Sequence, residues 1–250
     1  MHSSHSAVRP RNWLKPVLFL FVATAATLPR VRAETSVAVA DPVVMTIGDE
    51  PVSAREYRLV MERQVAGVYG YFKQTQNLDD HAGYWIETTG ENGPLARLRQ
   101  VVRDELVRIK VHQAVAKKRG LADKTTYADF QRDFVAENAR RKDEHARGGV
   151  IYGPPQYREA AYYYIRLGDL VYKLQESLAT ELEPGITEAA IAAFHEKNKG
   201  EKPLDEVRLK IRALLATQEA GRQLRALCAT ARVETDPAAL RPLVPRVDAK

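Results

Sequence analysis

The chain has a single cysteine among its 250 residues, Cys228, so it cannot close an internal disulfide bond. Its fold must be held by an apolar core, and a chain of this length with 45% hydrophobic residues can bury one. Cys228 shares helical spacing with Leu224 and Leu227. This spacing predicts a small buried side chain rather than a reactive or intermolecular thiol.

Catalytic motifs are missing as well: the sequence has no HExxH pair, no GxSxG turn and no glycine-rich phosphate loop. The histidines beyond residue 33 are scattered and form no ligand set: His81, His112, His145 and His195. Glu137, Asp143 and Glu144 lie in charged sequence, where no desolvation would raise a carboxyl pKa for acid catalysis. We therefore expect no catalytic residue, no metal site and no cofactor.

The sequence also lacks a hydrophobic run of membrane-spanning length. The apolar run PVLFLFVATAATL is shorter than the roughly 18 residues that a spanning helix needs. Arg9, Arg11 and Lys15 precede this run and Val31-Arg32-Ala33 follows it, which is typical of a secretory signal peptide. We expect cleavage after Ala33 and a periplasmic or otherwise extracytoplasmic mature protein. A membrane anchor is the alternative if residues 1–33 are retained.

The net charge of the chain is small once residues 1–33 are left out. Residues 1–33 contain five basic and no acidic residues, so the formal net charge falls from +6 to about +1. The remaining Lys and Arg residues alternate with Asp and Glu, which is typical of solvated helix faces. The basic character of the whole chain therefore gives no support for nucleic-acid binding.

Hydrophobic periodicity and turn residues predict a mainly α-helical chain with a small β-element. The first expected segments are a flexible lead over residues 34–42, a strand over 43–47, a helix after Ser53 and an irregular connection over 76–93. A helix from Pro94 that ends within residues 117–120, a helix from Thr126 and a long helix ending near 182 are expected next. Two helices starting near 187 and 205 and a strand over 232–235 complete the expected order. Pairing of the last strand with the first would close both ends into one helical domain over residues 43–236. The Pro- and Arg-rich residues 237–250 are predicted to be disordered.

Several helix ends carry specific capping signals. Ser53 stands three residues before Glu56, the spacing of a capping box. Pro94 suits a first helical turn, and Gly120 suits a left-handed residue after a helix end. Thr187 is predicted to cap the first helix of the final pair.

The apolar spacing also predicts which helix faces pack. The long middle helix should bury one stripe, made of Tyr157, Ala161, Tyr164, Gly168, Val171, Leu174, Leu178 and Leu182. The last helix should bury Val207, Ile211, Leu214, Leu215, Leu224 and Leu227. Residues 137–145 are almost wholly polar, so this helical part should project, find little to pack against, and fray near Gly148.

Two segments resemble a known protein family: VVMTIGDEPVSAREYRLVMERQ at residues 43–64 and ITEAAIAAFHEKNKGEKPLDEVRLKIRALL at residues 186–215. Together they are similar to the bipartite core of SurA-like and PrsA-like extracytoplasmic foldases, in which an N-terminal helical segment and a returning C-terminal helix build one chaperone module. In these foldases a parvulin-type prolyl isomerase domain is usually inserted at the place of residues 195–203, and such a domain needs roughly 50 residues. The resemblance therefore implies a chaperone module without its isomerase. It covers residues 43–75 and 186–235 best, whereas residues 121–185 correspond only to extra helices.

Aromatic residues supply the candidate binding site. Tyr162 and Tyr163 are predicted to lie off the apolar stripe of their helix, and Tyr69, Tyr84 and Tyr152 lie near or in predicted connections, where Trp85 follows Tyr84. Tyrosine offers a rigid amphipathic surface that can bind extended segments without demanding one sequence. Most of these rings could equally be core or boundary residues.

We therefore expect an exported SurA-like chaperone that holds unfolded or extended segments of secreted and envelope proteins without catalysis. One alternative is a prolyl isomerase family member that acts catalytically or with a separate parvulin. Another is a scaffold protein of the cell envelope with one dedicated partner. A spread of unfolded clients in a pull-down would favour the chaperone, and a single stoichiometric partner would favour the scaffold.

Overall fold

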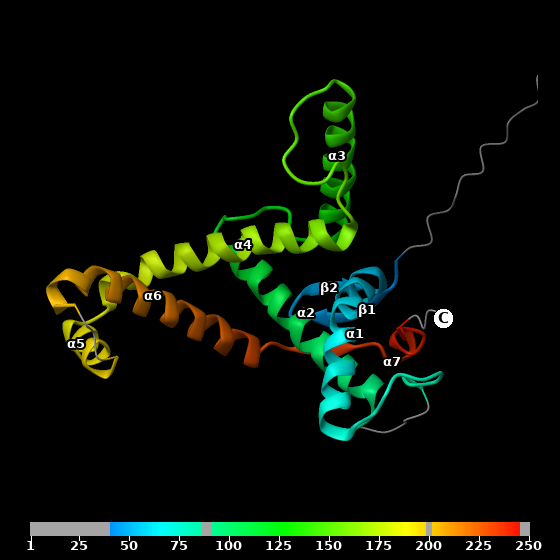
Figure 1. The fold of residues 1–250 in the computed structure, drawn as a ribbon, viewed down its shortest axis with the longest axis horizontal. Coiled ribbons are helices and arrows are strands. Elements are labelled where there is room, and N and C mark those ends of the chain that lie inside the picture. Colours follow the sequence, from blue (N-terminus) through cyan, green and yellow to red (C-terminus); the bar gives the residue numbers. More distant parts are fainter. Residues whose placement is uncertain (1–40, 87–91, 199–201, 246–250) are drawn as a thin grey trace, which may run out of the picture. The chain divides into compact units, whose positions relative to one another are not determined.

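The computed structural model describes residues 41–86, 92–198 and 202–245 (Figure 1). The predicted signal peptide over 1–33 and nearly all of the predicted lead over 34–42 lie outside the described residues, so both stay predictions. The described part is mainly α-helical with one small antiparallel sheet. This confirms the fold class that the periodicity predicts.

A three-stranded sheet joins the two ends of the described chain. Its strands are β1 (Val43–Ile47), β2 (Glu50–Ser53) and β3 (Val233–Thr235), in the order β2-β1-β3. The predicted pairing of β1 with β3 is confirmed, with Thr46 opposite Glu234. The strand β2 was missed; it forms a hairpin with β1 around Gly48, whose φ of +59° is a left-handed conformation that favours glycine.

Two long helices follow the hairpin and pack on each other. They are α1 (Ala54–Gln76) and α2 (Pro94–Lys118). Pro94 occupies the first turn of α2, as predicted, and Gly120 adopts a φ of +68° just beyond its end. The Gly120 N–H donates to the Lys117 carbonyl and the Leu121 N–H to the Ala116 carbonyl, at 3.0 and 2.9 Å. These two bonds are the Schellman pattern, which satisfies carbonyls that a helix end leaves free.

The helix α3 (Tyr127–Ala146) packs against α4 (Glu159–Leu182), as Figure 1 shows. Thr126 and Asp129 form a reciprocal capping box at the start of α3. The stripe predicted for α4 is wrong in its first half, because Ala161 and Gly168 are exposed whereas Tyr163 and Leu167 are buried. The predicted residues Leu174 and Leu178 are buried in the second half.

Three helices complete the fold after the short 3-10 helix η1 (Glu183–Gly185). They are α5 (Glu188–Lys197), α6 (Leu204–Ala229) and α7 (Pro237–Leu240). Thr187 caps α5 as predicted, its side chain accepting a hydrogen bond from the Ala190 N–H. The prediction that Leu214 and Leu227 are buried on α6 is wrong, because they are 44% and 48% exposed, whereas Ala216 and Ala220 of the same helix are fully buried.

The prediction of a disordered tail over 237–250 is wrong for residues 237–245. Asp236 accepts hydrogen bonds from the N–H groups of Ala238 and Ala239 and so begins α7. Leu243 then inserts into the core and is 1% exposed. Leu243 therefore anchors residues 237–245, although their composition predicts disorder. Residues 246–250 lie outside the described part.

The apolar interior of the described residues contains two clusters. The main core joins the sheet, α1, α2, Tyr127 of α3 and the first half of α4. A smaller core lies where α2, α4 and α6 meet and contains Ala116, Leu174, Leu178, Ala220 and Leu224. The helix α4 therefore belongs to two cores, which explains why its buried face does not follow a single stripe.

Candidate functional site

The six predicted aromatic residues do not form one open surface. Tyr84, Trp85 and Tyr163 are at most 3% exposed, and Tyr162 is 9% exposed. The prediction that Tyr162 and Tyr163 lie off the packing face is therefore wrong, because their rings pack against Phe130 of α3. Of the six, Tyr152 is fully accessible, at 88% exposed, and Tyr69 is partly buried.

Tyr69, Tyr84 and Trp85 form a structural cluster. Their ring centroids lie 4.6 to 5.0 Å apart, and the Trp85 indole N–H donates to the Tyr69 hydroxyl at 3.1 Å. The Tyr69 hydroxyl in turn donates to Asp80 at 3.2 Å. This cluster confirms that aromatics pin the irregular connection after α1, and it removes three residues from the candidate binding surface.

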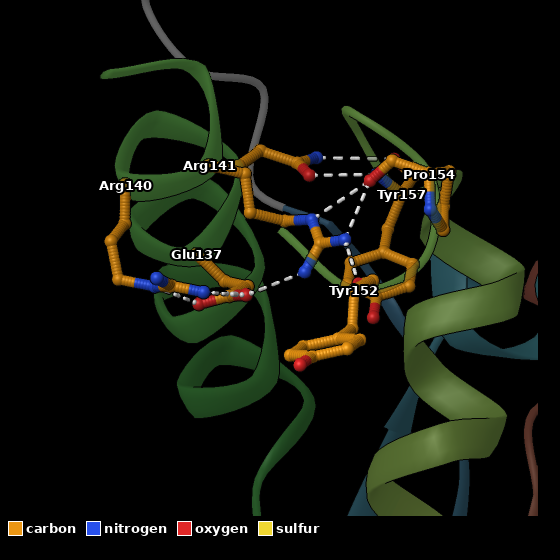
Figure 2. Close-up of polar contacts among 7 residues, drawn as sticks. Glu137, Arg140, Arg141, Tyr152, Pro154 and Tyr157 are labelled. Carbon is orange, nitrogen blue, oxygen red and sulfur yellow. Dashed lines mark hydrogen bonds and ion pairs between the residues drawn. The ribbon is translucent and has the colours of Figure 1, made fainter. Parts of the chain in front are cut away.

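Tyr152 lies in the loop that follows α3, and Arg141 holds this loop (Figure 2). The Arg141 guanidinium donates to the carbonyls of Tyr152 and Pro154 at 2.6 Å and lies 4.3 Å from the Tyr157 ring centroid. Arg141 is only 4% exposed. The prediction that residues 137–145 have little to pack against is therefore wrong, because loop carbonyls rather than apolar side chains are their partners.

A buried ion pair joins α1, α2 and α4. Lys110 Nζ lies 2.9 Å from Glu56 Oε2, and the two side chains are 1% and 0% exposed. The Tyr163 hydroxyl donates to Glu56 Oε1 at 2.8 Å, and burial beside this carboxylate raises the pKa of Tyr163 well above its usual value. The predicted capping box is thus half right: Ser53 accepts from the Glu56 N–H, but the Glu56 side chain points into the core.

A second polar cluster lies nearby at the surface and joins α1, α3 and α4. Glu159 accepts hydrogen bonds from the Tyr127 hydroxyl and from Arg55, the latter at 2.7 Å. Burial alone would raise the pKa of the Glu159 carboxyl, but these hydrogen bonds hold it below its usual value. The cluster therefore holds the three helices together. Because the Glu159 carboxyl is ionised at neutral pH, it has no proton to donate as a general acid.

His112 is a buried histidine on α2. Its side chain is 6% exposed, and its Nδ1 atom has no hydrogen-bond partner. Burial, with the nearby Arg108 cation, lowers its pKa to about 4. The ring is therefore neutral at physiological pH, and the interpretation of His112 as a structural residue is consistent with its place in the core.

An opening with an apolar wall lies between α2, the end of α6 and the β1–β2 turn. We call this opening the α2–α6 hollow; its volume is about 530 Å³. Its apolar wall is formed by Ile47, Val111, Ala114, Val115, Leu227 and Ala231. Its polar rim contains both signs of charge, from Asp49, Glu50, Lys117 and Lys118. A volume of this size and an apolar wall with a few polar groups are typical of binding sites.

Sequence reasoning missed this hollow, although one signal was present. Val107, Val111 and Val115 make α2 apolar over more than one face, which indicates packing partners on two sides. The apolar spacing predicts Leu227 on the buried face of α6, whereas it is half exposed at the wall of the hollow. No spacing rule predicts that α6 ends before covering this part of α2.

The described ranges contain neither a cluster of metal-binding side chains nor a helix that could span a membrane. Among residues 41–86, 92–198 and 202–245, no cluster of three or more His, Cys, Asp or Glu side chains could hold a metal ion. The helices in the same ranges are too short or too polar to cross a bilayer. No family model, curated protein or solved structure matches this chain. The resemblance to the SurA-like core therefore rests on its two sequence segments.

Proposed function

We propose that this chain is an exported holding chaperone, which binds unfolded or extended segments of secreted and envelope proteins and performs no catalysis. The α2–α6 hollow carries the proposal, because it presents an apolar wall to solvent beside the half-exposed Leu227. The SurA-like resemblance of residues 43–64 and 186–215 supports the same function. Under this proposal the protein is anchored to a membrane only if residues 1–33 are retained, and it binds no cofactor or nucleic acid.

The hollow suits weak binding that tolerates different sequences. Burial of apolar client surface contributes about 2.5 kcal/mol per 100 Å². The cost of association offsets much of this gain, so binding through a few side chains should be micromolar or weaker. Charges of both signs on the rim, such as Asp49 and Lys118, leave no strong field for a charged client. Binding should therefore depend only mildly on salt.

The test compares two leucines of the same helix. Leu227 is 48% exposed and lines the hollow, whereas Leu209 is 71% exposed and lies outside it. Leu227→Ser should weaken the suppression of client aggregation about threefold or more, because it removes apolar wall area. Leu209→Ser should leave the suppression unchanged. Light scattering with an unfolded exported protein measures both, and circular dichroism checks the fold. Equal activity of the two variants and the parent would contradict the assignment of this hollow.

The two alternatives predict different observations. A prolyl isomerase would accelerate the proline-limited refolding of a substrate, yet α5 ends at Lys197 and α6 begins at Leu204, which leaves no room for an inserted catalytic domain. A scaffold would retain one stoichiometric partner in a pull-down instead of many unfolded proteins. Aggregation suppression that survives in the presence of that partner would favour the chaperone.

A further inference from the structure

The sheet has two outer strands, β2 and β3, because its order is β2-β1-β3. Hydrogen bonds at both ends of β3 show which of its backbone groups face β1. The Gly48 N–H donates to the Arg232 carbonyl at 2.8 Å. The Asp236 N–H donates to the Val44 carbonyl at 3.0 Å. Because hydrogen-bonded residues alternate along an antiparallel ladder, residues 232, 234 and 236 are the ones that bond to β1.

Val233 and Thr235 of β3 therefore turn their backbone N–H and C=O groups away from β1, along the outer edge of the sheet. Outside the helices and the strand ladders, no backbone hydrogen bond among the described residues ends on these groups. Thr235 is exposed and Val233 is partly buried. The outer edge of β3 thus offers two residues, two positions apart, that can pair with one further extended strand.

The opposite edge of the sheet, on β2, is closed by a proline. Pro51 lies opposite Thr46, whose backbone groups face β3, so the nitrogen of Pro51 lies on the outer side of β2. A proline has no N–H to donate, and natural proteins protect sheet edges in this way. At its outer positions β3 instead carries valine and threonine, which are β-branched and favour strands. One edge is protected, and the other is open to pairing.

We propose that the outer edge of β3 binds an extended client segment as a fourth, backbone-paired strand that continues beside the α2–α6 hollow. Ala231, two residues before β3, lines that hollow, and so does Ile47, which lies opposite Val233. Main-chain hydrogen bonds hold a segment whatever its side chains are, and an apolar wall next to them accepts a side chain. This rests on the proposed function and specifies the conformation in which the client is held.

A client segment suits this edge better than a second copy of the chain. The strand β3 has three residues, so pairing of two β3 edges would bury little surface, whereas a stable dimer needs roughly 1,000 Å² or more. An extended client is longer than β3 and adds the contact with the hollow. The charged side chains of β3 do not oppose it, because Arg232 donates to Glu234 at 2.8 Å.

Amide hydrogen exchange of the full-length protein, followed by NMR, tests the edge residue by residue. In the free protein the Glu234 amide should exchange slowly and the Val233 and Thr235 amides quickly, because the Glu234 amide faces β1. The probe is a peptide of alternating valine and threonine with lysines at both ends. At saturation it should slow exchange at Val233 and Thr235 about fivefold or more, with a dissociation constant of about 0.1 to 10 mM. The same peptide with N-methylated internal amides has no donors for the edge and should have no effect.

Thr235→Pro removes the outward N–H and places a ring where the added strand would lie. It should weaken peptide binding about tenfold and keep the fold, because that N–H makes no ladder bond and proline is tolerated at such an edge position. Thr235→Val keeps the N–H and is the matched control, which should bind normally. Circular dichroism checks the fold, and the exchange experiment on the parent decides even if Thr235→Pro does not fold.

Three results would overturn the proposal: fast exchange at Val233 and Thr235 with saturating peptide, unchanged peptide binding by a folded Thr235→Pro, or slow exchange of both amides in the free protein. The last result would mean that another part of the chain or a second copy occupies the edge. Aggregation suppression without protection of these amides would refute the edge and leave the holding function standing. Protection of the amides without aggregation suppression would refute the holding function and leave the edge as a peptide-binding site.

Discussion

Replacing Lys110 with methionine should remove the cation from an ion pair that the core encloses. Lys110 Nζ lies 2.9 Å from Glu56 Oε2, with the two side chains 1% and 0% exposed. Methionine fills the volume of the lysine stem but leaves the Glu56 carboxylate buried without its counter-charge. Tyr163 then remains its hydrogen-bond donor on the other oxygen, at 2.8 Å.

The expected loss is a large share of the total stability. Breaking a buried ion pair from one side costs about 3 to 5 kcal/mol, and whole domains are stable by about 5 to 15 kcal/mol. Adding Glu56→Gln to Lys110→Met removes the buried charge and keeps an acceptor for the Tyr163 hydroxyl. The double variant should therefore recover at least about 2 kcal/mol relative to the sum of the two single losses.

Urea denaturation followed by far-ultraviolet circular dichroism measures the free energy of unfolding of each variant. The control is Lys73→Met, which breaks an exposed pair with Asp79 at 2.8 Å. It should cost less than about 1 kcal/mol because solvent screens that pair. A loss as small as this for Lys110→Met, or strict additivity of the two core substitutions, would refute the reasoning that the pair is enclosed and coupled.

Two further predictions concern His112 and Arg141. The pKa of His112 is lowered from 6.5 to about 4 in the folded state. As the pH falls below 6.5, the unfolded state therefore takes up a proton that the folded state does not. The free energy of unfolding is highest above pH 6.5 and falls by about 3 kcal/mol as the pH approaches 4. His112→Leu should flatten this part of the pH dependence of unfolding, whereas His145→Leu, at an exposed site, should not. Arg141→Met should increase proteolysis of residues 148–157 severalfold, because it releases the carbonyls that hold the loop. Arg140→Met, whose guanidinium is exposed and pairs with the same Glu137, is its control, and equal cleavage of both variants would contradict the assignment.

The helix ends could be predicted from sequence because their chemistry is local. Ser53, Thr126 and Thr187 each satisfy an N–H group three residues further along the same chain. Gly120 likewise closes α2 through bonds to residues three to five positions away. Such interactions need no knowledge of the rest of the fold, and all of these ends lie where the sequence predicts them.

The packing faces could not be predicted in the same way, because distant segments decide them. Tyr163 finds its partner Glu56 in another helix, 107 residues earlier in the chain. Arg141 is buried by the carbonyls of a loop, and backbone carbonyls leave no trace in a hydrophobicity pattern. A tyrosine placed off an apolar stripe was therefore interpreted as free surface, although a buried carboxylate makes it a core residue.

The position of the α2–α6 hollow follows from the same long-range closure. Pairing of β3 with β1 brings Ala231 and the end of α6 beside the β1–β2 turn, where the Gly48 N–H donates to the Arg232 carbonyl at 2.8 Å. Because α6 ends at Ala229, it leaves Val111 and Ala114 of α2 partly uncovered. The proposed binding wall thus depends on both ends of the domain being paired.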